Sequence, residues 1–289
     1  MKLLKDLLYK ARLEEVIGTT NVAIDTIAFD SRKVEAFTAF VAVPGTVVDG
    51  HKYIDRAIDN GAVAVVCEEL PEVKRTGVSY VRVKCSSEAL AHMACNFYNH
   101  PSAKLKLIGV TGTNGKTSVV TLLHALFTGL GYKAGMLSTV VNKIGNEELA
   151  STHTTPDALS VNELLALMVD EGCDYCFMEA SSHAIHQHRV TGLDFNIGVF
   201  TNITRDHLDY HKTFDNYIAA KKGLFDMLGA HAYALVNKDD NHSEIMVQNS
   251  AAKSKTFSVR ELADYKAKII ENRFSGLQLN INGNDVWAK

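Results

Sequence analysis

A glycine-rich segment between an apolar run and a helical pattern constrains the fold of this 289-residue chain more than any other feature. Residues 105–110 are apolar enough for a strand that is buried on both faces, and apolar side chains recur at helical spacing from Val119 to Leu130. Between them lies Gly109-Val110-Thr111-Gly112-Thr113-Asn114-Gly115-Lys116-Thr117-Ser118. A strand, a tight loop and a helix in this order predict an α/β fold.

The loop has the chemistry of a phosphate-binding turn. Glycines allow backbone N–H groups to point inward, and the amino end of the following helix adds a partial positive charge. Lys116 could then reach the β- and γ-phosphates of a nucleotide, and Thr117 could bind Mg²⁺. Val110 stands where the general G-x-x-x-x-G-K-[ST] motif has its first glycine. The alternatives are a glycine-rich turn with an exposed lysine and a dinucleotide-binding loop, whose glycines are spaced differently.

The rest of the sequence indicates two α/β domains that meet near Pro101. Before this proline we predict strands at 22–29, 40–43, 62–67 and 78–83 and helices at 53–60 and 87–98. After it we predict strands at 134–140, 175–178, 195–200 and 232–236, a helix at 214–228 and a hairpin at 277–287. We therefore expect a small α/β domain over 1–101 and a phosphate-loop domain with a mostly parallel sheet and flanking helices over 102–289.

Composition limits what the protein binds and where it works. Thirty Lys and Arg against 33 Asp and Glu give a formal net charge of −3, which offers no general attraction for nucleic acid or anionic lipid. No apolar run reaches the ~18 residues that span a bilayer, and the amino-terminal segment lacks the apolar core of a signal peptide. Five cysteines favour a reducing compartment. We expect a cytoplasmic protein that binds neither nucleic acid nor membrane.

Polar residues follow the strands that should flank the loop. Glu179 comes directly after the strand at 175–178, and Asp206 and His207 follow the strand at 195–200. Ligands bind at the carboxyl ends of parallel strands, so Glu179 and His207 are candidate metal ligands. Clustered His and Asp side chains are also typical of zinc hydrolases, but a zinc site leaves the loop unexplained. Lys221 lies in a predicted helix, where a solvated face is the ordinary interpretation.

Taken in order, these motifs resemble those of the Mur ligases, the ATP-dependent amide-forming enzymes of peptidoglycan synthesis, whose loop is similar to G-x-x-G-T-N-G-K-T. The resemblance covers almost the whole chain and includes Asp30-Ser31-Arg32, Asp49-Gly50, Thr154-Thr155-Pro156, Glu179-Ala180-Ser181-Ser182-His183, Gln187-His188-Arg189-Val190, Thr201-Asn202, Asp206-His207-Leu208-Asp209-Tyr210-His211 and Ala219-Ala220-Lys221. The chain departs from the family at residues 36–40, and it ends before the family's third, C-terminal domain.

The resemblance implies a set of site residues. It implies that ATP is bound by Gly112, Thr113, Asn114, Gly115, Lys116, Thr117 and Ser118, and that Mg²⁺ is bound by Thr117 and Glu179. Lys221 matches a lysine that the family carbamylates with CO₂, and its carbamate would hold a second Mg²⁺ with His207. The implied catalytic residues are Lys116, His207 and Lys221. Ser31 would contact the uridine nucleotide, and the muramoyl-dipeptide would be contacted by Thr154, Thr155, Ser181, Gln187 and Arg189.

The resemblance also implies a reaction. The implied enzyme adds the third amino acid, meso-diaminopimelate or L-lysine, to UDP-N-acetylmuramoyl-L-alanyl-D-glutamate through an acyl phosphate. The alternatives are the related ligase that adds D-alanyl-D-alanine and a non-catalytic nucleotide-binding module. The implied partners are the UDP-N-acetylmuramoyl-dipeptide, ATP and an amino acid, and we expect a monomer. Without the family's amino-acid-binding domain, this chain is expected to be inactive alone.

Overall fold

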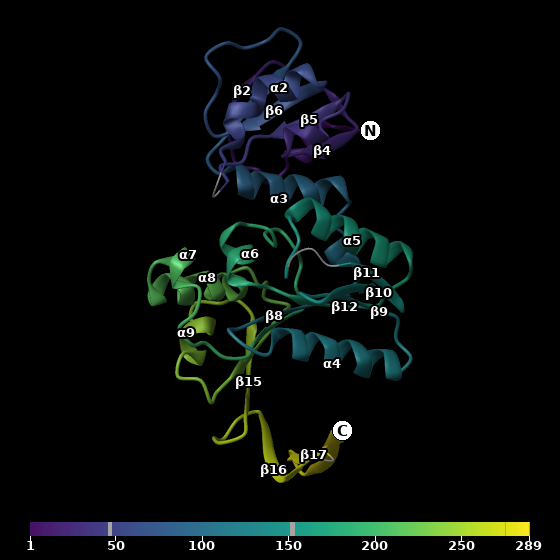
Figure 1. Ribbon diagram of the computed structural model, residues 1–289, viewed down its shortest axis with the longest axis vertical. Helices are drawn as coiled ribbons and strands as arrows, with labels where there is room; N and C mark the ends of the chain where they lie inside the picture. The colour runs from purple at the N-terminus through teal and green to yellow at the C-terminus, as the bar shows by residue number, and fades with distance from the viewer. Residues whose placement is uncertain (46–47, 151–153, 275, 289) are drawn as a thin grey trace. The chain divides into compact units, whose positions relative to one another are not determined.

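The computed structural model describes residues 1–45, 48–150, 154–274 and 276–288, and its chain divides into two compact units (Figure 1). The first unit contains Met1–Lys104, Pro156–Leu167 and Gln187–Leu193, and the second contains Leu105–Thr155, Met168–His186 and Asp194–Lys289. Helix α5 (Ala158–Asp170) begins in the first unit and ends in the second. Residues 102–104 and two later segments of the region 102–289 therefore group with the first unit.

The first unit is a sheet with helices on both faces. Its strands lie in the order β2 (Leu13–Ile17), β7 (Ser79–Val83), β6 (Ala62–Cys67), β5 (Thr38–Val41) and β4 (Thr26–Ala28), and all neighbours except β2 and β7 are parallel. One face packs Val66 against α1 (Leu4–Leu7) and α3 (Ser86–Phe97), and the other packs Val65 against α2 (Ile54–Asp59). Because successive residues of a strand point to opposite faces, the central strands are apolar throughout.

The strand predicted at 22–29 is two strands in the structure. β3 (Ala23–Ile24) pairs with β1 (Lys2–Leu3), whereas β4 pairs with β5. Asp25 lies between them, and its N–H donates to the carbonyl of Phe37 at 3.0 Å. The change of partner breaks the strand, and apolar sequence alone does not reveal such a change. β2 was not predicted because its residues are mostly exposed and show no apolar alternation.

The second unit contains a sheet whose centre is parallel, as predicted. Its strands lie in the order β11 (Glu147–Ala150), β10 (Val141–Ile144), β9 (Ala134–Leu137), β12 (Tyr175–Glu179), β8 (Lys106–Thr111), β13 (Ile197–Phe200), β14 (Tyr233–Asn237), β15 (Lys253–Ser258), β16 (Tyr265–Arg273), β17 (Gly276–Ile281) and β18 (Asn284–Ala288). Pairs from β9 to β16 are parallel, and the pairs at both ends are antiparallel. The predicted hairpin is confirmed, with Asn282 and Gly283 at positive φ in its turn.

Helices cover both faces of this sheet. α4 (Lys116–Gly129) packs against the face that carries Val110, and α8 (Phe214–Asp226) brings Leu224 beside Gly109 on the other face (Figure 1). The shorter helices are α6 (Ser182–His186), α7 (Leu208–His211) and α9 (Ser243–Val247). Among the described residues, no helix combines the length and the apolar character that a membrane span requires.

The predicted apolar stripe of α4 is only partly buried. Val119, Val120, Leu123 and Phe127 pack against the sheet. In contrast, Leu122, Leu126 and Leu130 are 70%, 55% and 64% exposed, so the prediction of one buried stripe was too wide. A helix that contacts a sheet on one side buries only part of its circumference, and the apolar pattern of α4 extends beyond that part.

Candidate active site

The glycine-rich loop occupies the position that the sequence predicts. β8 ends at Thr111 and α4 begins at Lys116, so residues 112–115 form the connection. β8 lies between β12 and β13, where Val110 is level with Glu179 and Thr111 is level with Phe200. The residues that follow these two strands therefore flank the loop on both sides.

The loop depends on two glycines at positive φ and on hydrogen bonds to Thr201 and Asn202, which follow β13; we call these two residues the brace. Gly112 has φ +151° and Gly115 has φ +88°. A β-carbon on Gly112 would lie 1.9 Å from the Thr201 hydroxyl oxygen, which donates to the Asn114 carbonyl at 2.8 Å. Asn202 accepts the Thr113 N–H at its carbonyl (2.8 Å) and the Asn114 N–H at its amide oxygen (3.1 Å). The brace fixes the loop before any ligand binds.

Thr117 and Glu179 form an oxygen pair beside the loop. The Thr117 hydroxyl donates to Glu179 Oε1 at 2.9 Å, and Thr139 donates to the same carboxylate oxygen through its N–H at 2.8 Å. Glu179 is 1% exposed. A hydroxyl and a buried carboxylate suit Mg²⁺, which uses few protein oxygens and completes its shell with water and phosphate. Thr139 lies outside the motifs named above, and no local sequence pattern marks it as a site residue.

Two lysines meet at one carbonyl of the loop. Lys116 Nζ donates to the carbonyls of Gly112 (3.0 Å) and Thr113 (2.9 Å), and Lys221 Nζ donates to the Gly112 carbonyl at 2.6 Å. Burial lowers the pKa of Lys116, with a partial opposing effect from Glu179 and Asp206. Burial, followed by the nearby charge of Lys116, lowers the pKa of Lys221 to about 7. Lys221 is 1% exposed, so the ordinary interpretation of it as a solvated lysine is wrong.

His207 lies at the rim of this region. It has φ +51° at the start of α7, and its N–H donates to Asp206 Oδ1 at 2.8 Å. Its ring lies 6.1 Å from the Tyr217 ring, and the Lys221 amine lies 4.5 Å from the centre of that same ring. His207 and Lys221 thus contact one aromatic side chain.

A group of histidines surrounds His211, which is 4% exposed. His211 Nε2 lies 3.0 Å from the Ser182 hydroxyl, and burial lowers its pKa to about 4, with smaller effects from His183, His186, His207 and Lys221. Among the described residues, no group of three His, Cys, Asp or Glu side chains is arranged to hold a metal ion. The cluster in the described structure therefore does not have the ligand set of a zinc hydrolase.

Two of the predicted dipeptide contacts lie against the Glu179 strand. The Thr155 hydroxyl donates to the Glu179 carbonyl at 2.8 Å and accepts the Ser181 N–H at 3.3 Å. The Ser181 hydroxyl accepts the N–H of Ala184 at 3.1 Å and so caps α6. Thr154 precedes this pair and is half-buried. These residues are held beside a predicted metal ligand.

The other predicted substrate contacts belong to the first unit. Ser31 is 6% exposed and begins a 3₁₀ turn that Asp30 caps by accepting the Arg32 N–H at 3.0 Å. Arg189 donates through Nε to the Gln187 side-chain oxygen at 3.0 Å. Each unit is ordered by its own contacts, and the functional roles of these residues stay predictions.

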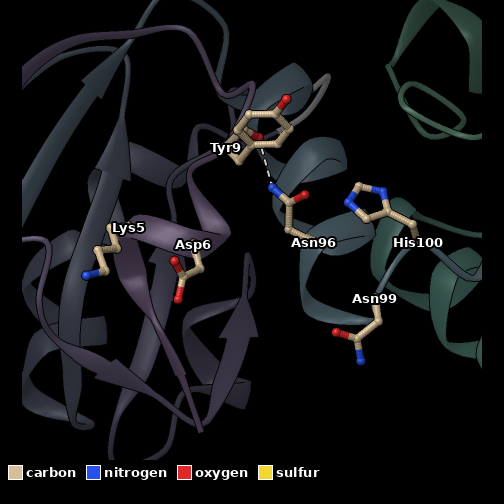
Figure 2. Close-up of a pocket in the computed structure, with 6 residues that line it drawn as sticks. All are labelled: Lys5, Asp6, Tyr9, Asn96, Asn99 and His100. Atoms are coloured by element: carbon tan, nitrogen blue, oxygen red, sulfur yellow. Dashed lines mark hydrogen bonds between the residues drawn. The ribbon is translucent and has the colours of Figure 1, made fainter.

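One described cavity of the first unit has no link to the predicted site (Figure 2). Its volume is about 460 Å³, and it is lined by Lys5, Asp6, Tyr9, Asn96, Asn99 and His100. The Asn96 amide already donates to the Tyr9 carbonyl at 2.8 Å, and Lys2 donates to the Asn99 side chain at 2.6 Å. The Asn96 and Asn99 side chains are thus already hydrogen-bonded within the first unit, and none of the predicted site residues lines the cavity.

Known proteins match this chain along most of its length. The model of the Mur ligase middle domain matches residues 110–286, and the model described as the Mur ligase family catalytic domain matches residues 23–98. The UDP-N-acetylmuramoyl-L-alanyl-D-glutamate–2,6-diaminopimelate ligase of Cytophaga hutchinsonii is 54% identical over 99% of this chain, and that of Parabacteroides distasonis is 52% identical over 99%. The chain spans 59% of the length of each relative.

Solved structures agree with this match. A structure of UDP-N-acetylmuramoyl-L-alanyl-D-glutamate–2,6-diaminopimelate ligase aligns with 100% of this chain and 59% of its own, with a TM-score of 0.83 and 27% identity. The MurF ligase from Thermotoga maritima in complex with ADP aligns with 92% of this chain and 57% of its own, with a TM-score of 0.57 and 20% identity, and so shares the fold. The chain therefore belongs to the Mur ligase family.

Proposed function

We propose that the complete protein is an ATP-dependent ligase that joins diaminopimelate to UDP-N-acetylmuramoyl-L-alanyl-D-glutamate. Two relatives that match 99% of this chain are named for that activity, although the chain spans only 59% of their length. The structural observation that carries the proposal is the meeting of Thr117, Glu179, the half-buried Lys116 and the buried Lys221 at one loop. Of the two amino acids that the sequence leaves open, the names of the relatives favour diaminopimelate over L-lysine.

ATP and Mg²⁺ are the ligands that this loop fits. Thr117 and Glu179 would hold one Mg²⁺, because their oxygens already lie 2.9 Å apart in a buried setting. His207 and a modified Lys221 would hold a second. When bound with ATP, Mg²⁺ draws charge from the phosphates and offsets their repulsion of a carboxylate substrate.

The residues of the loop would prepare ATP for attack. The D-glutamyl γ-carboxylate attacks the γ-phosphorus of ATP, ADP leaves, and an acyl phosphate forms; the amine of diaminopimelate then attacks the acyl carbon, and phosphate leaves as the amide forms. Activation is required because an ionised carboxylate resists attack by an amine. Lys116 would exchange its bonds to the Gly112 and Thr113 carbonyls for the phosphates, and the amino end of α4 would add its partial charge.

Lys221 has the properties of a lysine that CO₂ can modify. Only the neutral amine attacks CO₂: an N–C bond forms, one proton is released, and an anionic carbamate results. Burial and the charge of Lys116 lower the pKa of Lys221 to about 7, which makes neutral amine available near pH 7. The carbamate would then be an oxygen ligand for Mg²⁺, and its negative charge would be stabilised by the metal. This chemistry supports our proposal that Lys221 is carbamylated.

The substrate contacts follow from the same proposal. The UDP-N-acetylmuramoyl-dipeptide would be held by Ser31 in residues 1–101 and, in residues 102–289, by Thr154, Thr155, Ser181, Gln187 and Arg189. The Thr155 hydroxyl donates to the Glu179 carbonyl and accepts the Ser181 N–H, so a dipeptide held there would lie next to the proposed metal ligand.

Removal of the Lys116 amine tests the nucleotide site. Charge-assisted hydrogen bonds contribute roughly 1.5 to 3 kcal/mol each, so Lys116→Ala should weaken ATP binding about tenfold or more. Calorimetry on the 289-residue chain with Mg²⁺ and ATP measures this change. Lys222→Ala is the matched control, because Lys222 pairs with Asp226 on the same helix as Lys221 and should leave ATP affinity unchanged. Equal affinity of folded Lys116→Ala and wild type would contradict the assignment.

Substrate-dependent phosphate release tests the reaction. A chain that spans the whole length of the relatives is incubated with ATP, Mg²⁺ and the UDP-muramoyl-dipeptide, with either diaminopimelate or L-lysine. Phosphate release with diaminopimelate is the expected result. Release only with the UDP-muramoyl-tripeptide and D-alanyl-D-alanine would assign the related ligase instead, and ATP binding without release under any condition would assign a non-catalytic module.

A further inference from the structure

We propose that Tyr217 is a positioning residue that fixes the phosphate loop and Lys221 relative to each other. Its hydroxyl contacts the loop, and its ring contacts the lysine. Tyr217 lies in α8 one helical turn before Lys221, so the two side chains share a face of the helix. Both residues are 1% exposed. The inference rests on the proposed roles of the loop in ATP binding and of Lys221 in metal binding.

The hydroxyl of Tyr217 forms a hydrogen bond with the loop. It lies 3.2 Å from Thr113 Oγ1, and the Thr113 hydroxyl also lies 3.3 Å from the Thr204 carbonyl oxygen. Thr113 has one hydroxyl proton, and the Thr204 carbonyl can only accept it, so Tyr217 is the donor to Thr113. The Thr204 N–H donates to the same oxygen at 3.0 Å. Tyr217 therefore completes the hydrogen bonding of a loop side chain.

The ring of Tyr217 is committed to Lys221. The amine of unmodified Lys221 lies 4.5 Å from the ring centre, which is the geometry of a cation–π contact in the state before carbamylation. The same amine donates to the Gly112 carbonyl at 2.6 Å. The rings of His207 and His211 lie 6.1 and 5.2 Å from the Tyr217 ring and restrict its movement.

Two contacts join α8 to the loop. Lys221 contacts Gly112, and Tyr217, one helical turn earlier, contacts the next loop residue, Thr113. A shift of the loop relative to α8 must break at least one of these two contacts. Tyr217 thus sets the position of the proposed ATP loop relative to Lys221, which is proposed to bind metal. The effect of its hydroxyl and the effect of its ring should be separable by mutation.

The test compares Tyr217→Phe, which removes only the hydroxyl, with Tyr217→Leu, which also removes the ring. Calorimetry with Mg²⁺ and ATP on the 289-residue chain should show about twofold to tenfold weaker binding for Tyr217→Phe. Tyr217→Leu should weaken binding a further twofold or more, because Lys221 loses its aromatic contact and is less well held at Gly112. Tyr210→Phe is the matched control, since its hydroxyl lies 3.0 Å from His186 Nδ1 rather than from the loop, and its ATP affinity should equal that of wild type.

Melting temperatures separate positioning from simple loss of fold. In the positioning role, Tyr217→Phe loses ATP affinity while its melting temperature stays close to that of Tyr210→Phe. In a chain with ligase activity, Tyr217→Phe should raise the KM for ATP and keep kcat, whereas Tyr217→Leu should lower kcat as well. Wild-type affinity in Tyr217→Phe, or equal affinity in the Phe and Leu variants, would overturn the inference. A wild type that does not bind ATP would instead overturn the proposed function.

Discussion

Two predicted sites of this molecule differ in the signs and the burial of their charged side chains. In the second unit, Lys116 and Lys221 have like charges and both bond to the Gly112 carbonyl, where Lys116 is half-buried and Lys221 is buried. In the first unit, Asp30 and Arg32 have opposite charges and meet at the surface, where Arg32 donates to both carboxylate oxygens, at 2.9 Å from Nε and 2.7 Å from Nη2. The arrangement at the loop disfavours the protonated, charged form of the lysine amines. The arrangement at the surface favours the ionised forms of both Asp30 and Arg32.

The pKa values record this difference. Burial and the Lys116 charge lower the pKa of Lys221 to about 7, whereas the hydrogen bonds from Arg32 lower the pKa of Asp30 to about 2. Burying a charge without an opposite partner costs free energy of folding, so a protein that keeps such a group gains something other than stability. Strong perturbation by burial is typical of functional groups. The comparison therefore supports our proposal that the chemistry occurs at the loop, whereas the Asp30–Arg32 pair orders the turn around Ser31.

The largest effect should come from a side chain on Gly112. A β-carbon there would lie 1.9 Å from the Thr201 hydroxyl oxygen, and the backbone has φ +151°. Gly112→Ala should abolish measurable ATP binding and lower the free energy of unfolding by about 1–3 kcal/mol, because the loop or the segment that follows β13 must move. Chemical unfolding and calorimetry measure the two changes.

The control for this variant is Gly129→Ala at the other end of α4. A β-carbon on Gly129 meets nothing within 4 Å, and its φ is not positive. Alanine should stabilise the helix by up to about 1 kcal/mol and leave ATP affinity unchanged. If both alanine variants bind ATP like the wild type, the close packing of the loop is not what prepares it for nucleotide.

The loop also shows how far sequence could predict the site. The strand, the glycines and the helix lie together in sequence, and local periodicity was enough to place Lys116 and Thr117. Glu179 could be placed because it ends a strand of the same parallel sheet. Thr139 and Tyr217 contact the site through residues distant in sequence, Glu179 and Thr113, and no local pattern encodes such packing. The resemblance marked Lys221, but only the structure shows that it is buried.

The next largest effect is a difference in ligation rate between variants of two adjacent lysines, Lys221 and Lys222. Lys221 is buried at the loop, whereas Lys222 forms an ion pair with Asp226 on the same helix. In a chain that spans the whole length of the relatives, Lys221→Met should lower the rate of ligation about 10²-fold, because an oxygen ligand that stabilises transition-state charge is lost. Lys222→Met should keep the wild-type rate. Phosphate release measures both, and an unimpaired Lys221→Met variant would remove the reason to place chemistry at the buried pair.

The smallest effect should come from the exposed pair. Arg32→Ala removes an ion pair whose arginine side chain is 75% exposed, so the free energy of unfolding at neutral pH should fall only slightly. The pKa of Asp30 is depressed from 3.8 to about 2, so the stabilising contribution is fully present above about pH 4 and is lost as the pH falls through about 2. The difference between wild type and Arg32→Ala in chemical unfolding should therefore shrink over that range. The Asp30 carboxylate can still cap the turn in this variant by accepting the backbone N–H of residue 32, so the Ser31 backbone should stay in place. A fall in the free energy of unfolding at neutral pH as large as that of Gly112→Ala would mean that the pair behaves as a buried one. The contrast between the two sites would then not separate a structural charge pair from a functional one.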